Sequence, residues 1–166
     1  MFWIEHLGIV VRDLEQSISF YRKLFDREPI ERVTWSGPDA DYIAAMLGFP
    51  RGTLELAAAF FQVPHTNALL EMLQYSGIPQ GEMQSTSTDI GASHFGFYVE
   101  SLDETVTRLD LALAGPPTDI PYGPYKGGRT AYLKDPNGVN IQLMELRNRP
   151  GGMAAQWRGS AVRGQQ

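Results

Sequence analysis

The chain has 166 residues, a length that suits one domain and is sufficient to bury a hydrophobic core. Its net charge of -5 argues against nucleic acid or an anionic membrane as a partner, and the absence of cysteine excludes disulfides, thiolate metal sites and a cysteine nucleophile. No apolar run reaches the length of a membrane span, and the first residues lack the basic and apolar regions of a signal peptide. We therefore expect a globular protein of the cytoplasm.

The first predicted elements are a strand that begins at His6 and a helix that begins after Asp13. Asp13 is followed three residues later by Gln16, a spacing typical of a helix N-terminus, where short polar side chains satisfy free backbone amides. The apolar face of this helix is formed by residues at helical spacing, namely Leu14, Ile18, Tyr21, Leu24 and Phe25.

A short helix and three strands complete the first half of the chain. The short helix is predicted at 39–47, where Gly48 and Pro50 end it. The strands are predicted at 28–35, 54–63 and 68–75, with a turn between the last two.

The second half repeats this pattern. Residues 94–102 align without a gap on residues 6–14, with histidine on histidine, glycine on glycine and leucine on leucine. Ser101 and Glu104 form a second capping pair before a helix, whose apolar residues are Leu102, Val106 and Leu109. A loop with room for a short strand is expected at 116–124. Strands follow at 130–134 and 139–146, joined by the turn sequence Asp135-Pro136-Asn137-Gly138.

Two βαβββ units in tandem predict an α+β fold. We expect each helix to cover one face of its sheet and the other faces to form a shared, curved cup. The predicted single domain spans residues 1–146, with module 1 at about 1–76, a polar linker at about 77–92 and module 2 at about 93–146. The tail at 147–166 has no periodic apolar face and is expected to be mobile.

Paired βαβββ modules that each begin with a histidine and a glycine two residues apart, followed by a late Asp-Pro-Asn-Gly hairpin, resemble the vicinal-oxygen-chelate superfamily. This superfamily includes glyoxalases, bleomycin resistance proteins and extradiol dioxygenases. The resemblance covers about residues 4–146. It implies a glyoxalase-like fold, a small-molecule substrate, a homodimer and one divalent metal ion, which is Zn, Ni, Co, Mn or Fe.

Four residues are the predicted metal ligands. His6 and His94 occupy equivalent positions, and neutral imidazole is a common ligand of these ions. The resemblance implies one further ligand in the last strand of each module, and this position falls on Glu71 in module 1. In module 2, both the repeat alignment and the count from the turn place it on Gln142, whose amide oxygen is a neutral and weaker ligand. Glu145 is the reserve, although residues three apart on a strand point to opposite faces.

The replacement of a carboxylate by an amide changes the charge of the predicted site. Two imidazoles, one carboxylate and one amide leave a divalent site with one net positive charge, which favours binding of an anionic oxygen. If Gln142 does not bind, two histidines and one carboxylate remain, the set used by non-haem iron oxygenases. The sequence leaves both ligand sets open.

Glu55 and Glu145 are the candidate catalytic bases. Glu55 lies in an otherwise apolar strand, where a carboxylate is suited to general-base catalysis, although a solvated position at the strand end is the alternative. The glycine- and proline-rich segment 121–129 is a candidate lid over an anionic or aromatic substrate, the alternative being an ordinary connection with solvated charges. The substrate-binding residues of this lid are Tyr122, Tyr125, Lys126 and Arg129.

Three functions are compatible with these residues. The first is a metal-dependent lyase, isomerase or epimerase, which takes a proton from beside a carbonyl through an enolate-like intermediate. The second is a ferrous extradiol dioxygenase that cleaves a catechol ring. The third is a metal-free protein that binds and sequesters a drug. The resemblance favours the first function.

Overall fold

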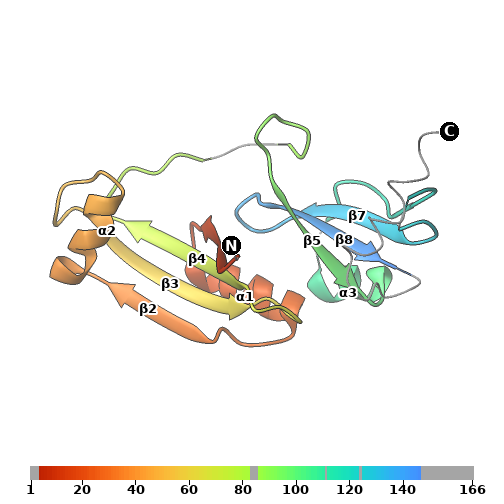
Figure 1. The fold of residues 1–166 in the computed structure, drawn as a ribbon, viewed down its shortest axis with the longest axis horizontal. Helices are drawn as coiled ribbons and strands as arrows, with labels where there is room; N and C mark the ends of the chain where they lie inside the picture. The colour runs from red at the N-terminus through yellow and green to blue at the C-terminus, as the bar shows by residue number, and fades with distance from the viewer. Residues whose placement is uncertain (1–3, 83–85, 111, 124, 147–166) are drawn as a thin grey trace. The chain divides into compact units, whose positions relative to one another are not determined.

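The computed structural model describes residues 4–82, 86–110, 112–123 and 125–146 (Figure 1). The chain divides into two compact units, residues 1–84 and 85–166, with the boundary inside the predicted linker. The predicted mobile tail at 147–166 lies outside the described residues. Among the described helices, none is long and apolar enough to cross a membrane.

Unit 1 is a four-stranded mixed sheet with the strand order β1-β4-β3-β2. The first strand, β1, is parallel to the last strand, β4, and the other neighbours are antiparallel. The strands are β1 (His6–Val10), β2 (Glu31–Trp35), β3 (Glu55–Gln62) and β4 (Leu69–Ser76). The helices are α1 (Leu14–Phe25), the 3-10 turn η1 (Gly37–Ala40) and α2 (Asp41–Met46).

The predicted elements of unit 1 are present, with small differences at their ends. The strand expected from residue 28 begins at Glu31, after Pro29, which has no backbone donor for a strand ladder. The helix expected at 39–47 is formed as η1 followed directly by α2.

Helix α1 covers one face of this sheet. The side chain of Asp13 accepts a hydrogen bond from the Gln16 amide at 2.9 Å, which confirms the predicted cap. The apolar side of α1 is buried, and the ring of Phe25 packs against Phe61 of β3 at 5.9 Å. We call this side of the sheet the helix face of unit 1.

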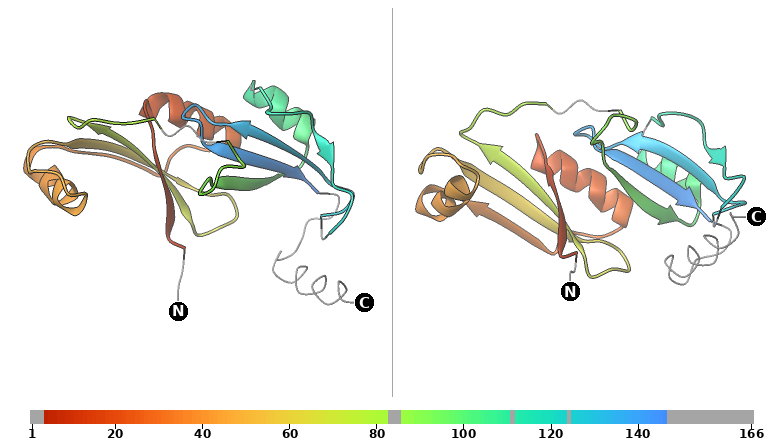
Figure 2. Two further views of the ribbon diagram at one scale, coloured as in Figure 1. Left: turned by 90° about the horizontal axis from the view of Figure 1, so that it is seen from above. Right: turned by 45° about the horizontal axis from the view of Figure 1, so that its top comes forward.

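Helix α2 lies on the opposite face of the same sheet, as Figure 2 also shows. Ile43 and Ala44 of α2 form a buried cluster with Leu54 and Leu56, and Tyr75 of β4 is among the half-buried residues packed against it. Leu56 is paired with Tyr75, and the alternation of side chains places both on the same face as Glu71. Helix α2 therefore covers one end of the face that carries Glu71.

Unit 2 has the same topology, with the strand order β5-β8-β7-β6 and with β5 parallel to β8. Its elements are β5 (His94–Val99), α3 (Leu102–Leu109), β6 (Thr118–Asp119), β7 (Arg129–Lys134) and β8 (Asn140–Glu145). The turn before β8 forms as predicted: the Asp135 carboxylate accepts from the amides of Asn137 and Val139, and Gly138 has a φ of 87°. The prediction of an α+β fold built from two βαβββ modules is confirmed.

In each unit a side chain of the last strand also accepts a hydrogen bond from the first amide of the helix. In unit 1 the side-chain oxygen of Gln74 accepts from the Leu14 amide at 2.7 Å. In unit 2 the Glu145 carboxylate accepts from the Leu102 amide at 2.8 Å. The repeat aligns Gln74 with Glu145, so the two units satisfy the same free helix amide from the same strand position.

We expect Gln74→Leu to lower the free energy of unfolding by roughly 1–3 kcal/mol, because the half-buried Leu14 amide loses its partner. Urea denaturation followed by circular dichroism measures the change. Gln16→Leu is the control, since it alters an exposed glutamine of the same helix. Equal midpoints for Gln74→Leu and wild type would show that this hydrogen bond does not stabilise the fold.

Candidate functional site

His6 and Glu71 lie together on one face of unit 1. The parallel pairing of β1 with β4 sets Gly8 opposite Glu71, and His6 shares the face of Gly8 because the two residues are two positions apart. The distance between His6 Nε2 and Glu71 Oε2 is 3.4 Å. A Cβ at Gly8 would lie 3.6 Å from Glu71 Oε2, so a side chain at this position would contact the carboxylate. We call this face the site face of unit 1.

The orientation of the His6 ring is fixed by its neighbour in the chain. His6 Nδ1 donates a hydrogen bond to the Glu5 carboxylate. This bond raises the pKa of His6 above its usual value, and the negative charge of Glu71 adds to the effect. With its Nδ1 hydrogen directed to Glu5, His6 turns Nε2 towards Glu71, and this nitrogen carries a hydrogen in the protonated ring and a lone pair in the neutral ring. Metal-binding histidines are held by carboxylates in the same way.

Unit 2 repeats this arrangement with an amide in place of the carboxylate. The parallel pairing of β5 with β8 sets Gly96 opposite Gln142, and His94 shares the face of Gly96. A Cβ at Gly96 would lie 3.9 Å from Gln142 Oε1. The His94 ring meets the ring of Tyr132 edge-on, with centroids 5.5 Å apart. We call this face the site face of unit 2.

The two candidate bases do not lie on the site faces. Glu55 is the exposed first residue of β3 and is paired with Ser76, so alternation places it on the helix face of unit 1. Glu145 lies on the side of β8 that faces α3, where it accepts from the Leu102 amide. The same alternation that directs Gln142 to the site face turns Glu145 away from it, and Glu145 therefore does not replace Gln142 there.

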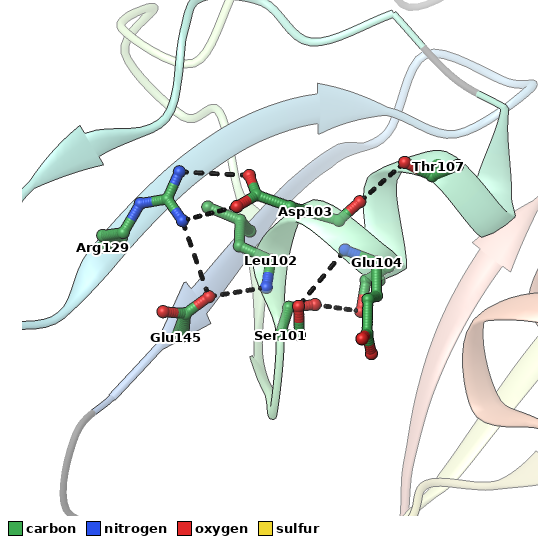
Figure 3. Close-up of polar contacts among 8 residues, drawn as sticks. Ser101, Leu102, Asp103, Glu104, Thr107, Arg129 and Glu145 are labelled. Carbon is green, nitrogen blue, oxygen red and sulfur yellow. Dashed lines mark hydrogen bonds and ion pairs between the residues drawn. The ribbon is translucent and has the colours of Figure 1, made fainter.

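Arg129 is held against helix α3. Its guanidinium group forms two hydrogen bonds to the Asp103 carboxylate, at 2.9 and 3.1 Å, and lies 3.8 Å from Glu145 (Figure 3). Register explains this position, because Arg129 is paired with Glu145 and shares its face. The sequence predicted a substrate contact for Arg129, whereas the structure gives it a partner in the first turn of α3.

The other predicted lid residues lie in the connection from β6 to β7. The side chain of Tyr122 is largely exposed, Lys126 is exposed and Tyr125 is half-buried. The Tyr125 carbonyl accepts from the Gly128 amide at 3.0 Å, which closes a tight turn. Contacts of Tyr122, Tyr125 and Lys126 with a substrate stay predictions.

Sequence reasoning missed two residues that contact the candidate ligands. Glu5 was overlooked although a carboxylate directly precedes His6 in the sequence. Thr130, whose hydroxyl oxygen accepts from the Gln142 amide, carries no signal in the sequence alone, because its contact depends on the register of β7 with β8.

Within the described residues, no three histidine or acidic side chains converge on a point that would hold a metal. Unit 1 by itself supplies one imidazole and one carboxylate, and unit 2 supplies one imidazole and one amide in the equivalent register. Imidazole nitrogen combined with carboxylate or amide oxygen suits a divalent transition metal. In each unit the glycine opposite the candidate ligand carries no side chain, and a Cβ there would make ordinary van der Waals contacts, with Glu71 Oε2 at 3.6 Å in unit 1 and with Met144 Cε at 3.5 Å in unit 2.

The sequence matches one protein family over most of its length. The model of the Glyoxalase/Bleomycin resistance protein/Dioxygenase superfamily matches residues 3–143. The chain belongs to this superfamily. The resemblance stated from the repeated motifs is therefore confirmed.

Relatives include enzymes of two kinds. A 2-epi-5-epi-valiolone epimerase from Actinomyces sp is 24% identical over 147 residues, which cover 86% of this chain and 79% of the epimerase. A lactoylglutathione lyase from Salmonella typhimurium is 26% identical over 145 residues, which cover 86% of this chain and 92% of the lyase. A glyoxalase family protein from Bacillus cereus has a similar fold, with a TM-score of 0.74 at 22% identity over 89% of this chain and 96% of that protein.

The ion pair between Asp103 and Arg129 predicts a pH-dependent contribution to stability. The hydrogen bond from Arg129 holds the pKa of Asp103 below its usual value. The pair therefore stabilises the fold above the pKa of aspartate in the unfolded chain, and the contribution is lost as the pH falls through the lower pKa of the folded state. We expect Asp103→Asn to lower the melting temperature at pH 7, with a difference from wild type that shrinks below about pH 4.

Thermal melts from pH 7 to pH 3 measure this difference. Asp39→Asn, at an exposed position of η1, is the control. A difference between Asp103→Asn and wild type that stays constant with pH would contradict the assignment.

Proposed function

We propose that this protein is a metal-dependent enzyme of the lyase, isomerase or epimerase type. The substrate is a small molecule with two neighbouring oxygens, and the reaction passes through an enolate-like intermediate. The observation that carries the proposal is the His6–Glu71 pair, set opposite a glycine and repeated in register as His94 and Gln142. The named relatives, an epimerase and a lactoylglutathione lyase, support this class of chemistry.

In this proposal the bound group is one divalent cation, either Zn, Ni, Co, Mn or Fe, and its ligands belong to the predicted set of His6, Glu71, His94 and Gln142. Such a cation supplies Lewis acidity towards two neighbouring substrate oxygens. Since Gln142 is neutral, the donor set carries less negative charge than a set with two carboxylates, and it favours a substrate oxygen with negative charge.

We assign the proton transfer to Glu71. Glu55 and Glu145 lie on helix faces, and the residues that β5, β7 and β8 direct to the site face of unit 2 include no acidic side chain. On the site face of unit 1, Glu31 shares the face of Glu71 through its pairing with Phe60, but it is exposed on the edge strand β2, two strands from Glu71. The side chain of Glu71 is 19% exposed, and its position beside His6 makes it accessible from the site face. A carboxylate there is suited to take the proton next to the substrate carbonyl.

Metal content tests the binding part of the proposal. We expect near-stoichiometric metal in wild type purified without added metal, loss of that metal in His6→Ala and reduced metal in Gln142→Ala, measured by elemental analysis. His65→Asn is the matched control, because His65 lies exposed in a turn with a φ of 60°, which asparagine tolerates. Wild type that takes up no metal even on reconstitution would refute the metal site and favour a binding protein. Bound iron together with catechol cleavage would favour the dioxygenase.

Proton exchange tests the catalytic part. Metal-loaded protein is incubated in deuterium oxide with dihydroxyacetone and a panel of other small α-hydroxyketones, and loss of the proton beside the carbonyl is followed by proton NMR. We expect exchange to fall at least about 100-fold in Glu71→Gln, because the general base is lost. Glu55→Gln is expected to keep the wild-type rate. Metal content is measured on each variant, and undiminished exchange in metal-loaded Glu71→Gln would exclude Glu71 as the base.

A further inference from the structure

The side-chain amide of Gln142 is held by a short chain of hydrogen bonds within unit 2. Gln142 Nε2 donates to Thr130 Oγ1 at 3.1 Å. The Thr130 hydroxyl in turn donates to the backbone carbonyl of Leu143 at 3.0 Å. Both contacts are half-buried, and all three residues lie on the neighbouring strands β7 and β8.

This chain determines which end of the amide points to the site face. The Leu143 carbonyl is an acceptor only, so the single hydroxyl hydrogen of Thr130 is committed to it. The hydroxyl oxygen then accepts, and only the nitrogen end of the Gln142 amide can donate to it. The amide oxygen is thereby turned away from Thr130, in the direction of Gly96. If the amide were reversed, Gln142 Oε1 would face Thr130 Oγ1 with no hydrogen between the two oxygens.

Cation binding depends on the orientation of an amide side chain, but not on which oxygen a carboxylate presents. Both oxygens of a carboxylate can bind a cation, whereas an amide binds only through its oxygen. The two units differ accordingly. Thr130 is paired with Met144, and the repeat aligns Met144 with Leu73, whose partner is Ala58. The unit with Glu71 thus has an alanine, without a hydroxyl, at the position where the unit with Gln142 has a threonine.

We propose that Thr130 is a positioning residue that holds the amide of Gln142 with its oxygen presented to a divalent cation. This inference rests on the metal site of the proposed function. It assigns Thr130 no contact with the cation or the substrate, and its effect is exerted through Gln142 alone.

Cobalt(II) titration of the full-length protein, followed by visible absorption, tests the inference. Thr130→Val keeps the shape of the side chain and removes the hydroxyl. We expect it to raise the dissociation constant for cobalt(II) roughly tenfold. Thr130→Ser, which keeps the hydroxyl, is expected to bind as wild type does. Thr105→Val is the matched control, since it removes a hydroxyl that donates to the Ser101 carbonyl at 2.7 Å in helix α3. Its cobalt affinity is expected to be unchanged, and thermal melts verify that each variant is folded.

A double-mutant cycle separates positioning from general support of the strand. In Gln142→Glu the ligand is a carboxylate that needs no orientation, so adding Thr130→Val is expected to change cobalt affinity by less than about twofold. Wild-type affinity in Thr130→Val, or the same loss in the Gln142→Glu background, would overturn the inference and leave the metal site intact. If wild type binds no cobalt, the metal site and the inference both fall.

Discussion

The parallel pairing between the first and last strands of each unit is the constraint on which the rest of the structure depends. It joins β1 to β4 and β5 to β8, and in both cases it sets a glycine opposite the candidate ligand, Gly8 opposite Glu71 and Gly96 opposite Gln142. A slip of one residue would turn the ligand to the other face of the sheet and would also expose the apolar residues that pack under the helix. The register that buries the core of each unit therefore also sets its candidate ligand opposite a glycine.

The last strand of each unit contributes side chains to both faces of its sheet, because successive side chains point in opposite directions. Residues 71 and 142 point to the site face, whereas Gln74 and Glu145, three positions further on, point to the helix face and satisfy the first amide of the helix. The carboxylate of Glu145 is thus explained by the helix that it stabilises. Its proximity to Arg129 belongs to the same network, in which Asp103 of the first helical turn also takes part.

The repeat made most of the fold predictable. Helix caps at Asp13 and Ser101 depend on residues three positions apart, and the alignment of Glu71 with Gln142 depends on a pattern visible along the chain. What the sequence did not reveal depends on contacts between distant segments. Arg129 was expected near a substrate because it follows a glycine-rich loop, yet the register of β7 turns it towards Asp103, 26 residues earlier in the sequence. The face of Glu55 likewise follows from pairing with β4, which no local pattern specifies.

The two halves of the repeat have become electrostatically different while keeping the same backbone. In unit 1 the histidine has carboxylates on both sides, Glu5 at Nδ1 and Glu71 at Nε2. On the same site face, burial raises the pKa of Tyr75, and the negative charge of Glu71 adds to this effect. The matching positions in unit 2 hold Ser93 and the neutral Gln142. Attraction of a cation depends on charge, whereas an amide ligand depends on orientation. In the proposed metal site, the contribution of the first unit would therefore be chiefly electrostatic. In the second unit the proposed ligand would need a hydroxyl to orient it, and Thr130 supplies a hydroxyl that accepts from Gln142.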